Sequence, residues 1–271
     1  MSKLIVSANS KKHLLSLLNK KIDGVILSIK GLSVNDSFFV DTSILDEIDF
    51  NNKEIFISLN KLMHNNDLEQ LRMVLNTLKG RNVKILFYDM AVYNIAKELD
   101  MVDKLVICQD HLNASILSNS FYYNIGIRGS YITSDITGSE LLEIKKNSKM
   151  NIMFMVYGYA PIFYSRRYLI SNYLKYINDN KKGNNYSIVS DSGIRYPISE
   201  EEYGTTIYTD REINLINYLD MLKDIDYIVM KSNKIEDNKF NDMVDRFINM
   251  DTSDDGNYEG FFNTKTIYRV K

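Results

Sequence analysis

The chain has 271 residues, of which 45% are hydrophobic and 25% charged, and its formal net charge is -2 at pH 7. This composition is typical of a globular protein and excludes an intrinsically disordered chain. A general polyanion-binding protein would be distinctly basic, so only a local basic patch is compatible with this charge.

The chain contains a single cysteine, Cys108. One thiol excludes an internal disulfide framework and any zinc or iron–sulfur site built from several thiolates of this chain. The amino terminus has no long apolar run with a cleavage site, and no segment approaches the length needed to span a membrane. We therefore expect a cytoplasmic protein that does not associate with membranes.

Short apolar runs alternate with amphipathic helical patterns along the chain. Eight runs predict strands, at residues 4–8, 24–30, 54–60, 83–89, 104–110, 123–133, 151–158 and 226–231. Helical patterns, with apolar residues at intervals of three and four, occur at 13–21, 67–79, 90–99 and 139–146. This alternation predicts a parallel sheet with right-handed crossovers, and eight strands favour a TIM-like (β/α) barrel. An open parallel α/β sheet is the alternative.

The interval between the seventh and eighth strands is too long for one crossover. It contains helical patterns at 165–177 and 211–224, with two β segments around a Ser–Gly turn within 186–199. Because no linker rich in Pro, Gly or Ser sets it apart, we predict one domain over residues 1–271 with an insertion at about 159–225. A terminal helix at 239–250 and a short strand at 264–270 follow.

Barrels and doubly wound sheets carry their sites at the carboxyl ends of the strands. Polar residues follow the predicted strands here: Asn60, Asp89, Asp110, His111, Asn113, Asp135, Tyr157 and Lys231. Aspartates that end consecutive strands can hold a metal or act as acid and base. Helix capping is the alternative, and we favour it for Asp89 and Asp135. Asp89 stands at an N-cap position, and Thr137 with Glu140 fits a capping box.

The remaining reactive residues are less informative. Cys108 lies inside an apolar strand, where a free cysteine usually packs as a small hydrophobe. His13 and His64 fall in or beside predicted helices and are interpreted as surface residues, which leaves His111 as the histidine with a site role. The sequence has no serine elbow, HExxH, phosphate loop or GxGxxG motif, so no conventional protease arrangement is visible.

The segment from Val156 to Tyr176 has the highest density of functional residue types. It turns through Gly158 and Pro161 and then carries adjacent arginines, Arg166 and Arg167. Six tyrosines accompany them: Tyr157, Tyr159, Tyr164, Tyr168, Tyr173 and Tyr176. Arginines beside tyrosine rings suit a carboxylate, a phosphate or stacked bases. The alternative is that half of these tyrosines pack as an amphipathic core.

Within this segment, MFMVYGYAPIFYSRRYLIS resembles the signature region of peptidase family U32, the collagenase-like peptidases. That signature is approximately E-x-F-V-H-G-A-x-C, followed by Y-S-G-R-C and a leucine-rich helix. The resemblance continues through GIRGSYITSDITGSELLEI, DYIVMKSNKI and GFFNTKTIYRVK, and so spans most of the chain.

The chain departs from the signature at its reactive positions. The glutamate falls on Met153, the histidine on Tyr157 and the two cysteines on Pro161 and Tyr168. The resemblance therefore implies a short, cysteine-poor branch without the iron–sulfur cluster of the cysteine-bearing members. Members near that branch are associated with tRNA modification, the prephenate-dependent 5-hydroxylation of the wobble uridine.

Three functions follow from this resemblance. The leading hypothesis is a protein of tRNA uridine hydroxylation that has tRNA as partner and prephenate as co-substrate, and that acts alone or with a paralogous U32 subunit. The second is a U32-type peptidase, and the third is a non-catalytic partner subunit. The candidate catalytic residues are Asp110, His111, Asp135 and Tyr157. The candidate substrate-binding residues are Asn113, Arg166, Arg167, Arg195 and Lys231. The positive charges of the arginines and the lysine suit a small carboxylate. We expect loss of one cation to weaken anion binding with little change in thermal stability.

The single cysteine gives a testable expectation about cofactors. The purified protein should be colourless and contain no stoichiometric iron, because one thiol cannot hold an iron–sulfur cluster. Anaerobic purification followed by iron and sulfide analysis checks this. A visible absorption band with stoichiometric iron and sulfide, in protein free of any partner chain, would contradict it.

Overall fold

The computed structural model describes residues 2–109, 112–179, 186–252 and 256–264. The chain divides into two compact units: a barrel unit of Met1–Gly158 with Ile213–Lys271, and an insertion unit of Tyr159–Glu212. The insertion unit is shorter than the predicted insertion, because residues 213–225 belong to the barrel unit. None of the helices in the described ranges has the length and apolar composition that a membrane crossing requires.

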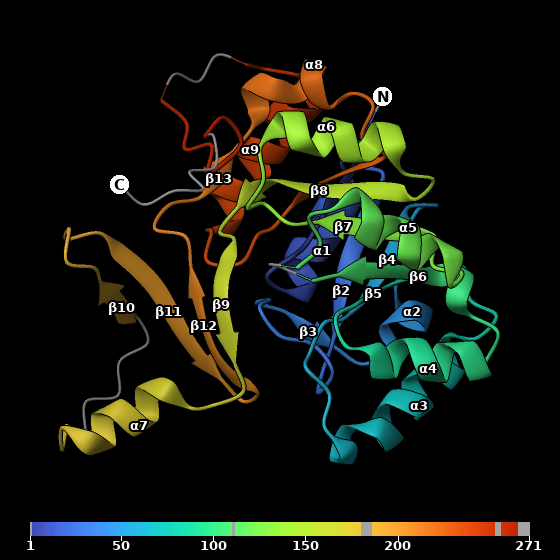
Figure 1. Ribbon diagram of the computed structural model, residues 1–271, viewed down its shortest axis with the longest axis horizontal. Coiled ribbons are helices and arrows are strands. Elements are labelled where there is room, and N and C mark those ends of the chain that lie inside the picture. The colour runs from blue at the N-terminus through green and yellow to red at the C-terminus, as the bar shows by residue number, and fades with distance from the viewer. Residues whose placement is uncertain (1, 110–111, 180–185, 253–255, 265–271) are drawn as a thin grey trace. The chain divides into compact units, whose positions relative to one another are not determined.

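The barrel unit is a closed sheet of parallel strands (Figure 1). Its strands are β1 (Lys3–Val6), β2 (Gly24–Ile29), β4 (Glu54–Leu59), β5 (Lys84–Phe87), β6 (Leu105–Cys108), β7 (Gly129–Ile132), β8 (Asn151–Gly158) and β14 (Tyr227–Met230). Each pairs with the next, and β1 pairs with both β2 and β14, which closes the barrel. The TIM-like barrel and its eight predicted strands are confirmed, and the open sheet is excluded. Two short strands are added, β3 (Phe39–Val40) beside β2 and β13 (Ile213–Asn214) antiparallel to β8.

Helices lie around the outside of the barrel (Figure 1). They are α1 (Lys11–Leu18), α2 (Ile44–Glu47), α3 (Leu68–Leu78), α4 (Met90–Glu98), α5 (Ile116–Asn124), α6 (Gly138–Asn147), α8 (Leu219–Leu222) and α9 (Asp237–Asn249), with 3₁₀ turns η1 (Asn65–Asp67), η2 (Val102–Lys104) and η3 (Ile216–Tyr218). Two predicted caps are present. Asp89 accepts a hydrogen bond from the Ala91 amide at 2.9 Å, and Thr137 with Glu140 forms the capping box of α6.

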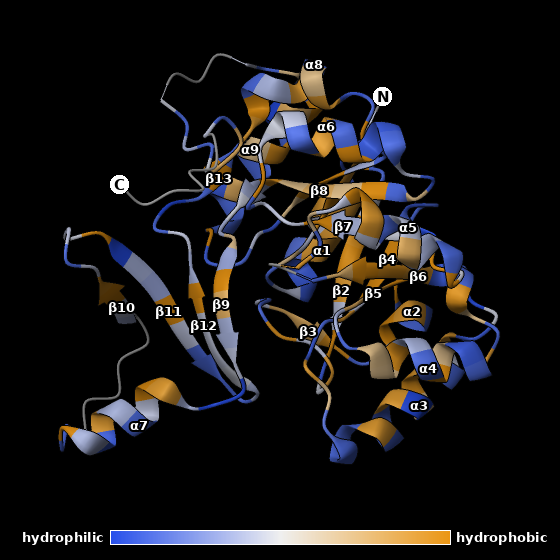
Figure 2. Ribbon diagram, viewed as in Figure 1, coloured by the Kyte–Doolittle hydropathy of each residue, from blue (hydrophilic) through white to orange (hydrophobic). Residues whose placement is uncertain are grey.

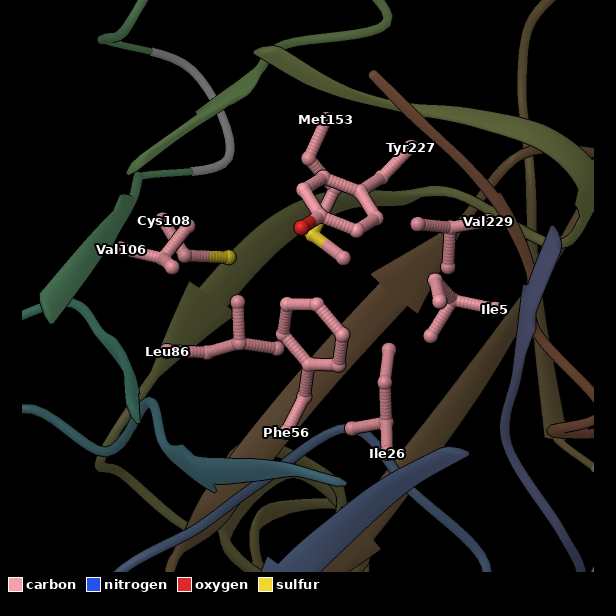
Figure 3. Packing of buried hydrophobic residues seen from close by; sticks show 9 residues of the cluster. All are labelled: Ile5, Ile26, Phe56, Leu86, Val106, Cys108, Met153, Tyr227 and Val229. Atoms are coloured by element: carbon pink, nitrogen blue, oxygen red, sulfur yellow. The ribbon is translucent and has the colours of Figure 1, made fainter. Parts of the chain in front are cut away.

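Alternate side chains of the strands fill the barrel interior. Figure 3 shows them converging from the strands: Ile5, Ile26, Phe56, Leu86, Val106, Cys108, Met153, Tyr227 and Val229. In Figure 2 the barrel strands are mainly hydrophobic in colour, whereas the surrounding helices carry both kinds of residue. Burial of each large apolar side chain stabilises the fold by about 1.5–3 kcal/mol. Cys108 is part of this core, as its position in an apolar run predicted.

Two predicted elements differ from the structure. The predicted strand at 123–133 begins only at Gly129, because Tyr123 and Asn124 end α5. Gly126, with a φ of 103°, stops that helix in the backbone region that glycine adopts at least cost. The predicted helix at 211–224 is broken into β13, η3 and α8, since Ile213 and Asn214 pair with β8. The predicted strand at 264–270 lies outside the described residues from position 265 onward.

The insertion unit is an antiparallel sheet with one helix. Its elements are β9 (Pro161–Ser165), α7 (Leu169–Tyr176), β10 (Tyr186–Val189), β11 (Arg195–Glu201) and β12 (Gly204–Tyr208). The strand order is β10-β11-β12-β9. The two β segments predicted within 186–199 correspond to β10 and the start of β11, and the helix predicted at 165–177 contains α7. The sequence did not predict β9 (PIFYS) or β12 (GTTIY), two short segments without a regular alternation of apolar and polar residues.

His13 is buried, not exposed as the sequence interpretation had it. Its side chain packs in α1 against Phe240 of α9, with ring centroids 5.6 Å apart. The Asn9 amide donates to Nδ1 at 3.1 Å, and Asp237 Oδ1 lies 3.0 Å from the same nitrogen. Burial lowers the pKa of His13 below its usual 6.5, and outweighs Asp237, which acts in the opposite direction.

This pKa shift predicts a pH dependence of stability. Because unfolded chains bind a proton at His13 more readily, the free energy of unfolding should fall as the pH drops below about 6.5, by at most about 1.4 kcal/mol per pH unit. Chemical denaturation between pH 5 and 8 measures the slope of the free energy of unfolding against pH. His13→Gln should flatten this slope, and the control Leu15→Gln, at an exposed site, should leave it unchanged. Equal slopes in wild type and His13→Gln would show that the pH dependence does not arise from His13.

Candidate functional site

The carboxyl end of the barrel carries a buried ion pair. Lys231 follows β14, and its Nζ donates to Asp36 Oδ1 and Oδ2 at 3.1 and 3.3 Å. The exposed fractions of the two side chains are 16% and 5%. The Ser28 hydroxyl of β2 donates to Asp36 at 2.5 Å. Residues 195 positions apart in the sequence thus share one polar cluster at the barrel mouth.

Small polar residues surround this pair. Ser7 follows β1, and its hydroxyl lies 3.1 Å from that of Ser232 and accepts from the Ser232 amide at 2.9 Å. Ser37 donates to Asn233 Oδ1 at 2.8 Å. By alternation, Ser7 and Ser28 occupy the interior positions directly above Ile5 and Ile26 of the core. The core is therefore apolar in its middle and polar at this end.

The loop that carries Asp36 is fixed at several points. The amide of Asn60, which follows β4, bonds with both backbone groups of Val34 at 2.9 and 3.0 Å. Ser33 donates to the Ser58 carbonyl, and Asn233 Nδ2 donates to the Asn35 carbonyl at 3.3 Å. A carboxylate held in this way is oriented before any ligand arrives.

Gly158 allows the backbone at Lys231 to lie close to the end of β8. The Lys231 amide donates to the Tyr157 carbonyl at 2.8 Å, which sets β14 against the end of β8. Gly158 has a φ of 126°, and a Cβ there would lie 2.5 Å from the Lys231 carbonyl oxygen. Lys231 and Tyr157 thus lie at the same end of the barrel, as predicted.

Tyr157 nevertheless does not face the barrel interior. Met155 pairs with Val229 and Tyr157 with Met230, so Val156 is an extra residue in β8 and forms a bulge. The bulge reverses the alternation, and the Tyr157 ring packs against Phe240 and Phe247 of α9, at 6.0 and 6.4 Å between centroids. Its side chain is 1% exposed. Tyr157 is therefore part of the packing between the barrel and α9. Its catalytic role stays a prediction, which this buried position does not support.

Two of the other strand-end candidates, Asp110 and His111, lie outside the described residues. Asp135 is exposed, and its amide donates to Thr133 Oγ1 at 3.2 Å. The N-cap of α6 is Thr137, so the capping role favoured for Asp135 is wrong. Asn113 is fully buried, and its Nδ2 donates to Ser130 Oγ and to the Tyr131 carbonyl at 2.8 and 2.9 Å. Both amide protons are thus used within the fold, so Asn113 has a structural role in anchoring the loop after β6 to β7.

The three candidate arginines belong to the insertion unit, whereas Lys231 belongs to the barrel unit. Arg167 and Arg195 are exposed, and Arg166 is half-buried. A pocket that combines them with Lys231 therefore stays a prediction. Burial, with Glu212 and Asp210 nearby, raises the pKa of Tyr159 to about 12, so this phenol stays protonated at neutral pH.

Other potential ligand sites in the described residues are limited. No group of three or more histidine, cysteine, aspartate or glutamate side chains there could hold a metal ion. A cavity of about 30 Å³ lies at the opposite end of the barrel, between Phe56, Lys84, Met153 and Tyr227. It has room for one or two water molecules and not for an organic acid or a nucleoside.

Sequence reasoning missed Asp36 and Ser28, which bond to each other beside Lys231. Asp36 lies in the polar VNDS loop after β2 and not at a strand end, and Ser28 is one polar residue in an apolar run. Strict alternation along β2, which places Ser28 on the same face as Ile26, was the available signal.

The fold and this polar mouth define a (β/α) barrel protein with its candidate site at the carboxyl end of the strands. Residues 10–243 match Peptidase family U32, so the chain belongs to that family. The structure is similar to "The Structure of the U32 Peptidase Mk0906", with a TM-score of 0.54 and 10% identity, over 85% of this chain and 92% of that one. At 10% identity, this structural similarity concerns the fold alone.

A curated relative is similar in sequence. The tRNA hydroxylation protein P2 of Bacillus subtilis (strain 168) is 26% identical over 179 residues. The match covers 63% of this chain and 58% of the relative, which is less than two thirds of the relative's length.

The Lys231–Asp36 ion pair predicts a loss of stability when either side chain is replaced. This differs from the sequence-based expectation that loss of one cation changes thermal stability little. Lys231→Met or Asp36→Asn should each lower the free energy of unfolding by about 3 kcal/mol, because each leaves a buried charge without its partner. The double variant should lose at least about 1 kcal/mol less than the sum of the two.

Urea denaturation of the wild type and the three variants measures this coupling. Arg72→Met, which breaks the exposed Arg72–Glu98 pair, is the control and should cost less than about 1 kcal/mol. Additive losses in the Lys231 and Asp36 variants would show that the two side chains are not energetically coupled.

Proposed function

We propose that this protein acts in the 5-hydroxylation of the wobble uridine of tRNA and binds a small carboxylate such as prephenate at the carboxyl end of its barrel. The observation that carries the proposal is the Lys231–Asp36 pair, a preoriented donor and acceptor at the end of the barrel where such folds bind ligands. Membership of the U32 family and the similarity to a tRNA hydroxylation protein support the same assignment.

The pair is neutral overall, which limits the ligands that it suits. Lys231 has three N–H donors, and its remaining capacity beside Asp36 suits a ligand carboxylate. Asp36 accepts from Ser28 and can accept from a ligand hydroxyl as well. Prephenate carries a hydroxyl and two carboxylates, so its hydroxyl can donate to Asp36 and one carboxylate can accept from Lys231. Its second carboxylate requires a further donor beyond this pair.

The residues of this chain do not fit the iron–sulfur cluster implied for the cysteine-bearing relatives. Positions 161 and 168 hold Pro161 and Tyr168, and the single thiol, Cys108, lies in the apolar barrel core. We therefore assign no step to such a cluster. The peptidase hypothesis depends on Asp110, His111 and Asp135. The first two lie outside the described residues, so the hypothesis stays a prediction.

Nucleoside mass spectrometry of tRNA from a deletion strain tests the proposal. Loss of the gene should abolish or strongly reduce 5-hydroxyuridine derivatives, and a wild-type copy should restore them. A copy with Lys231→Met and Asp36→Asn together should restore less than about a tenth of that level, because a charge-assisted contact contributes roughly 1.5–3 kcal/mol.

The matched control is Lys145→Met with Asp226→Asn. This pair is part-buried and joins α6 to the start of β14, at the opposite end of the barrel from Lys231 and Asp36. If both double variants are expressed at equal levels, only the mouth variant should lose activity. Unchanged hydroxyuridine in the deletion strain would refute the proposed function, and full restoration by the mouth variant would refute the assigned site.

A further inference from the structure

Helix α7 of the insertion unit leaves large side chains exposed to solvent. It contains Leu169, Ile170 and Leu174, yet none of its residues is buried. In Figure 2 it carries interspersed hydrophobic and hydrophilic residues. Tyr173 and Tyr176 are 62% and 84% exposed. Rings that project to this extent contribute little to the folding of the unit.

Polar contacts hold α7 to the sheet, beside the half-buried side chains of Leu169, Ile170 and Leu174. The Leu169 amide donates to Thr205 Oγ1 at 3.0 Å, and the Ser171 amide donates to both carboxylate oxygens of Glu200 at 3.1 Å. The Tyr168 hydroxyl donates to the Glu202 carbonyl at 2.7 Å. Glu200 thus occupies the amino-terminal end of the helix, so any phosphate at α7 must be recognised by side chains.

Four exposed residues form one continuous face of α7. Asn172, Tyr173, Lys175 and Tyr176 are all exposed and are related by separations of three and four residues, which are neighbours on a helix. We call this set the α7 face. Two of its members offer aromatic rings, and the other two offer an amide and a cation.

The sequence around this face is mainly basic. Residues 161–182 contain Arg166, Arg167, Lys175, Lys181 and Lys182 and one acidic residue, Asp179, although the whole chain has a net charge of -2. Glu200 binds the Ser171 amide at the amino-terminal end of α7. Exposed aromatic rings beside an excess of cations are the combination by which proteins stack the bases and track the backbone of single-stranded nucleic acid. A protein partner would not by itself require this charge bias.

We infer that the α7 face binds the unpaired bases of an RNA loop, with Tyr173 and Tyr176 stacking on bases and Lys175 contacting the backbone. This inference rests on the proposed function, since it assigns a contact surface for the RNA substrate. It places recognition of the RNA on the insertion unit and leaves the carboxyl end of the barrel for the small acid.

Binding of an unmodified tRNA transcript with a wobble uridine to the full-length protein tests the inference. Base stacking contributes roughly 1–3 kcal/mol per ring, so Tyr173→Ala with Tyr176→Ala should weaken binding by about 30-fold or more. Tyr173→Phe with Tyr176→Phe keeps both rings and should stay within about 3-fold of wild type. Lys175→Gln should reduce the slope of log affinity against log salt by about 0.7.

The control is Leu117→Ala with Phe121→Ala on α5, two apolar residues that are 82% and 58% exposed in the barrel unit. It should bind as wild type does. Melting temperature is measured beside affinity and should not change in the alanine variants, because α7 buries no residue.

The outcomes separate the inference from the proposed function. If wild type binds the transcript and the tyrosine-to-alanine variant binds equally well, the α7 face is not the RNA surface, while the proposed function stands. If that variant instead changes the oligomeric state and keeps its RNA affinity, the face is a protein interface and the inference fails. Unchanged hydroxyuridine in the deletion strain refutes the proposed function independently of α7.

Discussion

Closure of the barrel at β1 is the constraint on which the rest of the structure depends. β1 lies between β2 and β14, so the first and last strands of the barrel are adjacent although more than two hundred residues separate them. This pairing brings Ser7 to Ser232 and the β2–β3 loop to the end of β14. Lys231 and Asp36 can form an ion pair only because the sheet is closed. The candidate site is therefore a product of the whole topology and not of any local motif.

The polar mouth also explains why the departures from the U32 signature need not abolish function. The signature glutamate and histidine fall on Met153 and Tyr157. In this chain Met153 belongs to the apolar core, and the bulge at Val156 turns Tyr157 toward α9. Polar residues at the mouth come instead from the ends of β1, β2 and β14 and from the loop after β2, and β14 pairs directly with β8. A ligand bound there would depend on Lys231 and Asp36 and not on the signature positions.

The sequence predicted the architecture and the position of Lys231 at the carboxyl end of the barrel, but not the contacts around it, for physical reasons that differ between residues. Burial on both faces makes parallel strands continuously apolar, and this pattern identified all eight barrel strands. Tyr157 was misplaced because one extra residue in β8 reverses the alternation, which no local pattern shows. Asp36 was missed because its partner is 195 residues away, and His13 because its burial depends on packing of α1 against Phe240. Long-range contacts of this kind cannot be derived from local periodicity.

The central claim is that the Lys231–Asp36 pair at the carboxyl end of the barrel binds a small hydroxy acid. Calorimetric titration of the purified protein with prephenate tests it most directly. The account predicts saturable one-to-one binding in the wild type and at least about a tenfold loss of affinity in the folded Lys231→Met/Asp36→Asn variant. It predicts unchanged affinity in the Lys145→Met/Asp226→Asn variant, whose ion pair lies at the opposite end of the barrel. Equal binding by the wild type and the mouth variant, or no binding by the wild type, would contradict it.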